Sequence, residues 1–394
     1  MKLALVGFGQ AGGKIVDAFV DYEKRTGQDV FRTPIAINTA EVDLQGLEHV
    51  PAERRVLIGQ ARVKGHGVGA DNELGAEIAA EDVDEIQAAI DDVPTHEVDA
   101  FLIVAGLGGG TGSGGAPVLA QHLKRLYTEP VYGLGVLPAA DEGGIYTLNA
   151  ARSFQTFVRE TDNLLVFDND AWRTTGESLR AGYSEINEEI VRRFGMLFGA
   201  GEVAADGAVG ESVVDSSEII NTLAGGGVST VGYAAETVDR SGRGLLSRFR
   251  DTGNGSNGNG LDDVNTTNRI TSLVRKAALG RLTLPCEVAG TERSLLVVAG
   301  PPDHLNRKGI ERGRKWLEEE TGSMEVRGGD YPLPGADRVA AAVLLSGVHR
   351  IPRVKEFQRV AIETQDNLDA IRDASEDNLE RLVQEGAEEI APLY

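Results

Sequence analysis

The sequence predicts an α/β protein in which a domain built on a parallel sheet is joined by a long central helix to a second, α+β domain. Short apolar runs, typical of buried strands, alternate with helical patterns in the first half of the chain, and this order gives a parallel sheet covered on both faces. Apolar residues recur at helical spacing over residues 183–199. With 394 residues, the chain is too long for one ordinary core, so a second domain is expected.

In the first domain, residues 1–182, strand-like runs are separated by helical patterns. We expect strands at residues 2–6, 34–38, 101–105, 131–137 and 164–167. Residues 183–205 are expected to form the connecting helix.

The second domain is expected to cover residues 206–350. Its strand-like segments are residues 228–233, 280–288, 294–299 and 339–345, and an amphipathic helix is expected at 307–321. Residues 239–265 are rich in Gly, Asn, Ser and Asp and are expected to form a flexible loop, because such a tract cannot bury a core. Residues 351–394 are expected to form an acidic C-terminal helix and tail.

The composition of the chain excludes several classes of protein. A formal net charge of -22 opposes binding to nucleic acid, whose phosphates would be repelled. The sequence contains no run of about 20 apolar residues that would predict a transmembrane segment, and no cleavable leader precedes the first strand. We therefore expect a cytoplasmic protein. Binding to membrane-associated adaptors is left open. The single cysteine, Cys286, excludes an internal disulfide framework.

A glycine-rich loop follows the expected strand at residues 101–105. Residues 106–115 read Gly-Leu-Gly-Gly-Gly-Thr-Gly-Ser-Gly-Gly and lead into an apolar helical pattern that begins near Ala116. Glycines allow successive backbone N–H groups to point into one concavity, and the positive end of the following helix dipole adds to it. The loop therefore predicts a phosphate-binding site.

Two further glycine-rich segments have the same setting. Residues 7–13 follow the first strand and contain Gly-x-Gly-x-x-Gly, a dinucleotide-binding fingerprint, and residues 65–75 also lead into a helical pattern. An NAD-type oxidoreductase would need a carboxylate after the next strand, where this chain has Asn38 and Thr39. That interpretation stays as an alternative, but three such loops favour one polyphosphate held from several sides.

Residues 108–114, Gly-Gly-Gly-Thr-Gly-Ser-Gly, match the signature of the tubulin and FtsZ superfamily of filament-forming GTPases, and residues 9–12 match the tubulin form of the first loop. The chain resembles this superfamily over most of its length, and within it the archaeal CetZ family. The resemblance implies GTP or GDP as ligand, with Mg²⁺ near Gln10, and together with the acidic composition it suggests the salt-rich cytoplasm of halophilic archaea. The residues implied to surround the phosphates are Gly9, Gln10, Ala11, Gly12, Asn38, Gly69, Ala70, Asp71, Gly109, Gly110, Thr111 and Gly112.

The resemblance also implies where the sugar and the base lie. Residues 138–143 resemble the ribose loop, with Pro138 and Glu142 at the sugar, although FtsZ has an Arg where this chain has Tyr146. The guanine-contacting positions of the family correspond to Asn169 and Asn187, with Tyr183 stacked on the ring. A side-chain amide presents a donor and an acceptor on one planar group, which suits the edge of guanine.

Asp215 and Glu218 are the expected catalytic residues. By local pattern Asp215 is a helix N-cap and Glu218 completes a capping box. The resemblance assigns this segment to the loop whose two acidic residues enter the nucleotide site of the next subunit, where a carboxylate orients and deprotonates the attacking water. Glu218 is the first choice for this role and Asp215 the second.

A site shared between subunits predicts self-assembly. A head-to-tail contact does not close on itself and therefore produces filaments. The resemblance implies a GTP-hydrolysing cytoskeletal protein that is active on self-association, and no long linker with a terminal adaptor peptide of the FtsZ kind is evident, which favours a role in cell shape. A GTP-binding scaffold without turnover stays as the other alternative.

Overall fold

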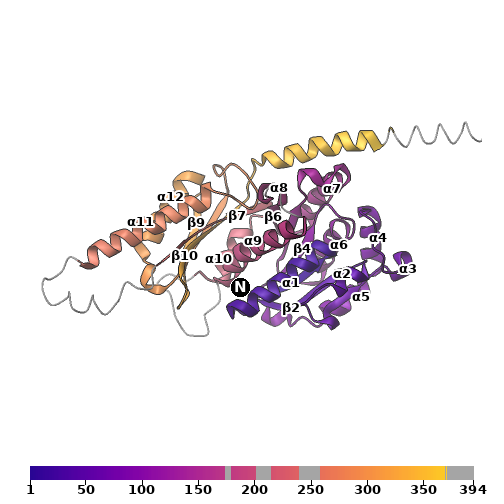
Figure 1. The fold of residues 1–394 in the computed structure, drawn as a ribbon, viewed down its shortest axis with the longest axis horizontal. Coiled ribbons are helices and arrows are strands. Elements are labelled where there is room, and N and C mark those ends of the chain that lie inside the picture. The colour runs from indigo at the N-terminus through magenta and orange to yellow at the C-terminus, as the bar shows by residue number, and fades with distance from the viewer. Residues whose placement is uncertain (174–178, 201–213, 239–257, 369, 371–394) are drawn as a thin grey trace, which may run out of the picture.

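The computed structural model describes residues 1–173, 179–200, 214–238, 258–368 and 370 (Figure 1). In these residues, ten strands form one continuous sheet in the order β3-β2-β1-β4-β5-β6-β7-β10-β8-β9. The strands are β1 (Leu3–Phe8), β2 (Phe31–Asn38), β3 (Arg55–Leu57), β4 (Ala100–Gly106), β5 (Val131–Leu137), β6 (Asn163–Asp168), β7 (Val228–Thr237), β8 (Arg293–Gly300), β9 (Glu325–Pro332) and β10 (Arg338–Ser346).

The sheet changes character where the two domains meet. From β3 to β6 all neighbours are parallel, as the sequence predicts for the first domain. Strand β6 pairs with β7 through only two residue pairs, and β10 then runs antiparallel to both β7 and β8. The second domain therefore extends the sheet of the first and does not form a separate one.

Helices cover both faces of the sheet, and each face has its own apolar core. They are α1 (Gly9–Thr26), α2 (Glu41–Gln45), α3 (Gln60–Val63), α4 (Asn72–Glu81), α5 (Val83–Ile90), α6 (Thr111–Leu126), α7 (Gly144–Glu160), α8 (Asn169–Trp172), α9 (Leu179–Gly199), α10 (Ser216–Leu223), α11 (Gly258–Leu279) and α12 (Arg307–Thr321), followed by an unlabelled helix over residues 352–368. Along β1, alternate side chains enter opposite cores, Leu3 and Leu5 on the side of α1 and α9, and Ala4 and Val6 on the side of α6.

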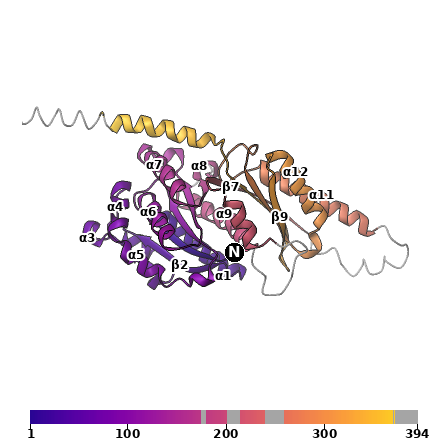
Figure 2. The same cartoon turned by 180° about the vertical axis from the view of Figure 1, so that it is seen from behind.

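Helix α9 lies between the two domains in both views (Figures 1 and 2). Its apolar stripe, which includes Ile190, Phe194 and Phe198, is fully buried. At its end the amino group of Met1 donates to the carbonyl of Phe198 at 3.0 Å. The helix therefore runs from the carboxyl edge of the parallel sheet to the amino edge.

Several expected boundaries differ from the structure. The helix expected to begin at residue 183 begins at Leu179, and residues 201–205 lie outside the described part. Of the loop expected at 239–265, residues 239–257 lie outside it, but residues 258–265 are the start of α11. This end of α11 is held by tertiary contact, because Asn306 Nδ2 donates to the carbonyl of Asp263 at 3.3 Å. The C-terminal helix is present over 352–368, and residues 371–394 lie outside the described part.

The strand expected at residues 280–288 is wrong. Within the described chain, this segment makes one isolated bridge, from Leu282 to Gly232, and is otherwise irregular. It crosses above the end of β6, where the carbonyl of Thr283 accepts from the backbone N–H of Asp168 at 2.8 Å. Its apolar residues fill the core without pairing. The fourth strand of the second domain is instead β9, which pairs with β8 and whose polar and glycine-rich sequence carries no strand signal.

Helix α1 approaches the sheet closely through one glycine. A Cβ atom on Gly12 would lie 2.2 Å from the carbonyl oxygen of Val104 in β4, whereas one on the adjacent Gly13 would lie 3.7 Å from the nearest atom, in Leu47. The first distance is impossible without moving the helix, and the second is an ordinary contact.

We expect Gly12→Ala to lower the free energy of unfolding by about 3 kcal/mol, because overpacking separates α1 from β4. The matched control Gly13→Ala should leave stability unchanged or raise it by about 0.5–1 kcal/mol, since Ala is the better helix former. Denaturant unfolding of the two variants measures both changes. Equal stabilities would contradict the close approach.

Candidate functional site

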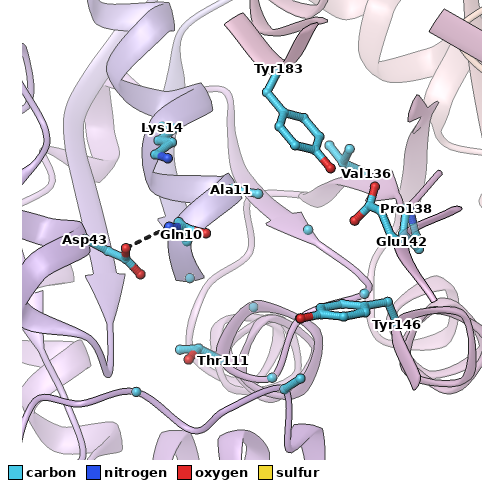
Figure 3. A pocket seen from close by; sticks show the side chains of 18 of the residues that line it. Gln10, Ala11, Lys14, Asp43, Thr111, Val136, Pro138, Glu142, Tyr146 and Tyr183 are labelled. Atoms are coloured by element: carbon cyan, nitrogen blue, oxygen red, sulfur yellow. Dashed lines mark hydrogen bonds between the residues drawn. The ribbon is translucent and has the colours of Figure 1, made fainter. Parts of the chain in front are cut away.

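A cavity of about 700 Å³ opens at the carboxyl edge of the parallel sheet (Figure 3). Its walls are the segments that follow β1, β2, β4, β5 and β6, together with α9. This is where ligands bind in open parallel sheets. Of the residues predicted to hold the nucleotide, those lining the cavity are Gly9, Gln10, Ala11, Asn38, Gly69, Ala70, Gly109, Gly110, Thr111, Gly112, Pro138, Glu142, Asn169, Tyr183 and Asn187.

Two predicted residues, Gly12 and Asp71, are not part of the described lining. Gly12 packs α1 against β4, as shown above. Asp71 is the N-cap of α4, where its carboxylate accepts from the backbone N–H of Leu74 at 3.0 Å. Both residues adjoin loops that line the cavity, but neither residue is part of the lining itself.

The N-termini of helices α1 and α6 lie at the cavity. In the described part of the chain, no side chain caps either N-terminus and neither first turn contains an acidic residue. By contrast, α4, α10 and α12 are each capped by their own Asp or Asn. Uncapped N–H groups and the positive ends of two long helix dipoles make this end of the cavity an anion site.

The loops at this anion site touch through backbone atoms. Gly9 has φ of +75°, and a Cβ there would lie 2.7 Å from the backbone nitrogen of Gly112. A Cβ on Gly75 would lie 2.5 Å from the carbonyl of Gly110. Only glycine permits these contacts, so α1, α4 and α6 converge on one point.

Asn149 of α7 fastens two of these loops from behind. Its buried Nδ2 donates to the carbonyl of Ala70 at 2.7 Å and to those of Gly108 and Gly109 at 3.2 and 3.3 Å. Ala70 has φ of +65°, which is unusual for a residue other than glycine. The sequence analysis did not identify Asn149, because nothing in its local pattern distinguishes it from a helix residue facing the core.

The opposite end of the cavity carries side-chain amides and an aromatic ring. Asn169 is 7% exposed, and its Oδ1 has no hydrogen-bond partner among the described residues. Asn187 and Tyr183 line the same end from α9. The Tyr183 hydroxyl points at Glu142 (Figure 3). Burial raises the pKa of Tyr183 to about 12, and the charge of Glu142 and a hydrogen bond to it act in the same direction.

Glu142 orders the loop after β5. Its carboxylate accepts from the backbone N–H of Ala139 at 2.7 Å, and the next residue, Ala140, donates its backbone N–H to Asp170 Oδ1 at 2.8 Å. The loops after β5 and β6 are thereby joined. Tyr146, which stands where FtsZ has an Arg, lines the cavity beside them (Figure 3).

Asp43 is the lining carboxylate that the sequence analysis missed. Its Oδ1 accepts from Gln10 Nε2 at 2.8 Å, and its Oδ2 accepts from Asn38 Nδ2 at 3.1 Å (Figure 3). The available signal was an acidic residue shortly after the strand that ends at Asn38. Arg173, which forms an ion pair with Asp141 at the other end, was also missed.

Asp215 and Glu218 lie far from this cavity within the described chain. Helix α10 packs against β8 and β9, and the carbonyl of Leu223 at its end accepts from Asn163 Nδ2 at the start of β6. The two acids therefore belong to the amino edge of the sheet. As the sequence predicts, Asp215 caps α10, accepting from the backbone N–H of Glu218 at 2.9 Å.

The two carboxylates differ in their environments. A hydrogen bond from Ser217, and then one from the backbone N–H of Glu218, lowers the pKa of Asp215. Burial, and then the charge of Asp215, raises the pKa of Glu218, while Arg327 and Arg314 oppose this shift. Glu218 is thus the stronger proton acceptor of the pair, the property that a general base requires.

Comparison with known proteins covers both domains. Residues 2–176 match the GTPase domain of the tubulin/FtsZ family, and residues 176–363 match the C-terminal domain of the tubulin-like CetZ proteins. The chain is 72% identical over 375 residues to the tubulin-like protein CetZ1 of Haloferax volcanii, with 94% of each protein covered. None of the described helices is both long and apolar enough to cross a membrane.

Two solved structures share the whole fold. The GDP-bound monomer of CetZ1 from Haloferax volcanii superimposes with a TM-score of 0.82 at 69% identity, covering 93% of this chain and 100% of that one. The GTPγS-bound protofilament of CetZ2 from the same organism gives a TM-score of 0.81 at 45% identity, covering 94% and 100%. The chain belongs to the CetZ family, within the tubulin/FtsZ superfamily.

Proposed function

We propose that this protein binds GTP and GDP with Mg²⁺ in the cavity, assembles head-to-tail into cytoplasmic filaments, hydrolyses GTP at the contact between subunits, and acts in the control of cell shape. The observation that carries the proposal is the unpaired, buried Oδ1 of Asn169 at one end of a cavity whose other end is formed by the N-termini of α1 and α6. The GDP-bound and GTPγS-bound relatives support it, and the family assignment removes the reason for an NAD-dependent oxidoreductase.

The two ends of the cavity select the two ends of a nucleotide. Backbone N–H groups of Gln10, Ala11 and residues 109–112 would bind the phosphates, which carry most of the charge. Asn169 Oδ1 would accept from N1–H and N2–H of guanine, which adenine does not present. Tyr183 would stack on the ring, with Asn187 beside it.

The donors around Asp43 fit a magnesium ion. Mg²⁺ prefers oxygen ligands from one or two carboxylates or amides together with phosphates and water. Asp43 and the amide oxygen of Gln10 supply such ligands at the phosphate end. Bound there, the ion would neutralise part of the phosphate charge, which the carboxylate of Asp43 would otherwise repel.

Hydrolysis requires the opposite edge of a second subunit. Asp43, the carboxylate at the phosphate end of the described cavity, has both oxygens occupied by amide donors. Glu218 and Asp215 lie at the amino edge, at the far end of α9. Head-to-tail stacking would bring them to the phosphate end of the neighbour, where Glu218 would activate water and Asp215 would hold the segment in place.

We expect Asn169→Ala to weaken GDP binding about 10- to 100-fold, because the guanine donors lose a buried acceptor worth about 1–3 kcal/mol. ADP binding, weak in the native protein, should not change. Calorimetry in concentrated KCl with Mg²⁺ measures both affinities, and Asn268→Ala, at an exposed Asn of α11, is the control. A native protein that binds ADP as tightly as GDP would refute guanine recognition.

We expect Asp43→Asn to raise the Mg²⁺ concentration needed for half-maximal GTP hydrolysis about tenfold, since one anionic ligand is lost. Glu41→Gln removes the same charge from the same short helix outside the cavity lining and should leave the Mg²⁺ dependence unchanged. Titration of Mg²⁺ into chelator-treated protein gives the two curves. Coincident curves would place the ion elsewhere.

We expect Glu218→Gln to bind GTP as the native chain does but to hydrolyse it at least about 100-fold more slowly, because the variant lacks the general base. Native turnover should rise more steeply than protein concentration. Mixing Glu218→Gln with Asn169→Ala should restore activity, since the intact cavity of one meets the intact acid of the other. Phosphate release with parallel light scattering follows both.

Native turnover that stays proportional to concentration, together with no recovery on mixing, would reject the shared site. Binding and assembly without turnover in any of these proteins would favour the scaffold alternative.

A further inference from the structure

We propose that Arg353, from the start of the C-terminal helix, is a positioning residue for base recognition: it holds the segment that carries Asn169 in place. The inference rests on the proposed guanine binding and adds a residue from outside the nucleotide-binding domain to it. The helix over residues 352–368 runs beside α7 in both views (Figures 1 and 2), which brings its first turn to the carboxyl ends of β5 and β6.

The Arg353 side chain is 10% exposed, and its guanidinium contacts both loops proposed to bind the nucleotide. Its Nε lies 3.4 Å from Asp168 Oδ2, and one terminal nitrogen lies 3.9 Å from Asp170 Oδ2 and donates to the carbonyl of Pro138 at 3.3 Å. The group also lies over the ring of Phe357, 4.3 Å from its centroid. Arg353 thus bridges the loop at the sugar and the turn at the base.

Asp168 and Asp170 flank Asn169 and determine where its amide points. Asp168 is 3% exposed at its side chain, and its Oδ1 accepts from the backbone N–H of Asp170 at 3.2 Å, which closes the turn at the start of α8. Burial raises the pKa of Asp168 to about 6, and the charge of Arg353 works against that shift. Without Arg353, a buried carboxylate directly beside Asn169 would lose its cation.

The other end of the same short helix is held in a similar way. The Trp172 ring contacts two guanidinium groups, with Arg193 at 4.0 Å and Arg281 at 4.8 Å from its centroid. Arg281, like Arg353, comes from chain that follows α9. Helix α8 is therefore clamped at both ends by residues outside its own domain, and Asn169 lies between the clamps.

The geometry requires arginine and not merely a positive charge. The guanidinium presents several donors in a fixed plane, so one group reaches Asp168, Asp170 and the Pro138 carbonyl while stacking on Phe357. A lysine ammonium is a point charge that would satisfy Asp168 but would not span both loops. Arg353→Lys therefore separates the positioning role from simple charge neutralisation.

The experiment compares GDP with IDP, whose base lacks the exocyclic N2 amino group that Asn169 would bind. In calorimetry with Mg²⁺ in concentrated KCl, we expect Arg353→Lys to weaken GDP binding about tenfold and IDP binding about twofold or less. The difference between the affinities for GDP and IDP should therefore become smaller. The matched control is Arg359→Lys, because Arg359 lies on the same helix, is 65% exposed and pairs with Glu363 at 2.7 Å. It should leave both affinities unchanged.

A second variant covers failure of Arg353→Lys to fold. Asp168→Asn with Arg353→Gln removes the buried carboxylate together with its cation, so that only the more exposed Asp170 and Glu356 lose their contact with Arg353. This variant should show the same reduced difference between GDP and IDP affinity. The inference would be overturned if a folded Arg353 variant kept the native ratio of GDP affinity to IDP affinity. It would also be overturned if the variant lost affinity for GDP and IDP equally and had a lowered melting temperature. If the native chain binds neither nucleotide, the proposed function itself fails, and this result is seen before any variant is tested.

Discussion

Close backbone contact between glycines at the carboxyl edge of the sheet is the constraint on which the rest of this structure depends. Gly12 brings α1 onto β4, Gly9 touches the start of α6, and Gly75 brings α4 against the same turn. A Cβ atom at these positions would lie 2.2 to 2.7 Å from a backbone atom of the neighbouring segment, so side chains would force the helices apart. Because they are absent, three loops distant in sequence form one wall, and the ends of two helix dipoles point into one cavity.

The cavity divides its chemistry between backbone and side chains. At the proposed phosphate end, the backbone N–H groups at the starts of α1 and α6 are available to a ligand because neither helix is capped by a side chain in the described chain. At the proposed base end, the cavity presents the amides of Asn169 and Asn187, which have directional donors and acceptors. The carboxylates of Asp43, Asp141 and Glu142 also line the cavity, so a bound polyphosphate requires a counter-ion.

The second domain contributes to the first in two distinct ways. Helix α9 joins the cavity, through Tyr183 and Asn187, to the amino edge, where α10 presents Asp215 and Glu218. Arginines that follow α9 in the chain return to the base end and hold α8. A ligand in the cavity therefore contacts elements that are packed against both domains, which is the arrangement needed for nucleotide state to influence a contact between subunits.

Much of this could be predicted from local sequence. The parallel strands, the phosphate loops, the helix over 307–321 and the N-cap at Asp215 depend on apolar periodicity, glycine spacing and capping residues, which are properties of neighbouring residues. Strand β9 could not be predicted, since Gly328, Gly329 and Asp330 have no strand propensity and pair only because β8 lies beside them. Residues 280–288 were misassigned for the opposite reason: their apolar character reflects burial without pairing.

The sequence by itself determined the family, the order of the loops and most of the residues that line the cavity, because a glycine signature and the residues at strand ends are readable along the chain. Only the tertiary structure decided which of them line the cavity: it left Asp71 and Gly12 outside the lining and brought Asp43, Asn149 and Arg353 to the site. These three act through contacts with residues distant in sequence. Such contacts depend on how helices pack across the sheet, and no local pattern encodes that distance.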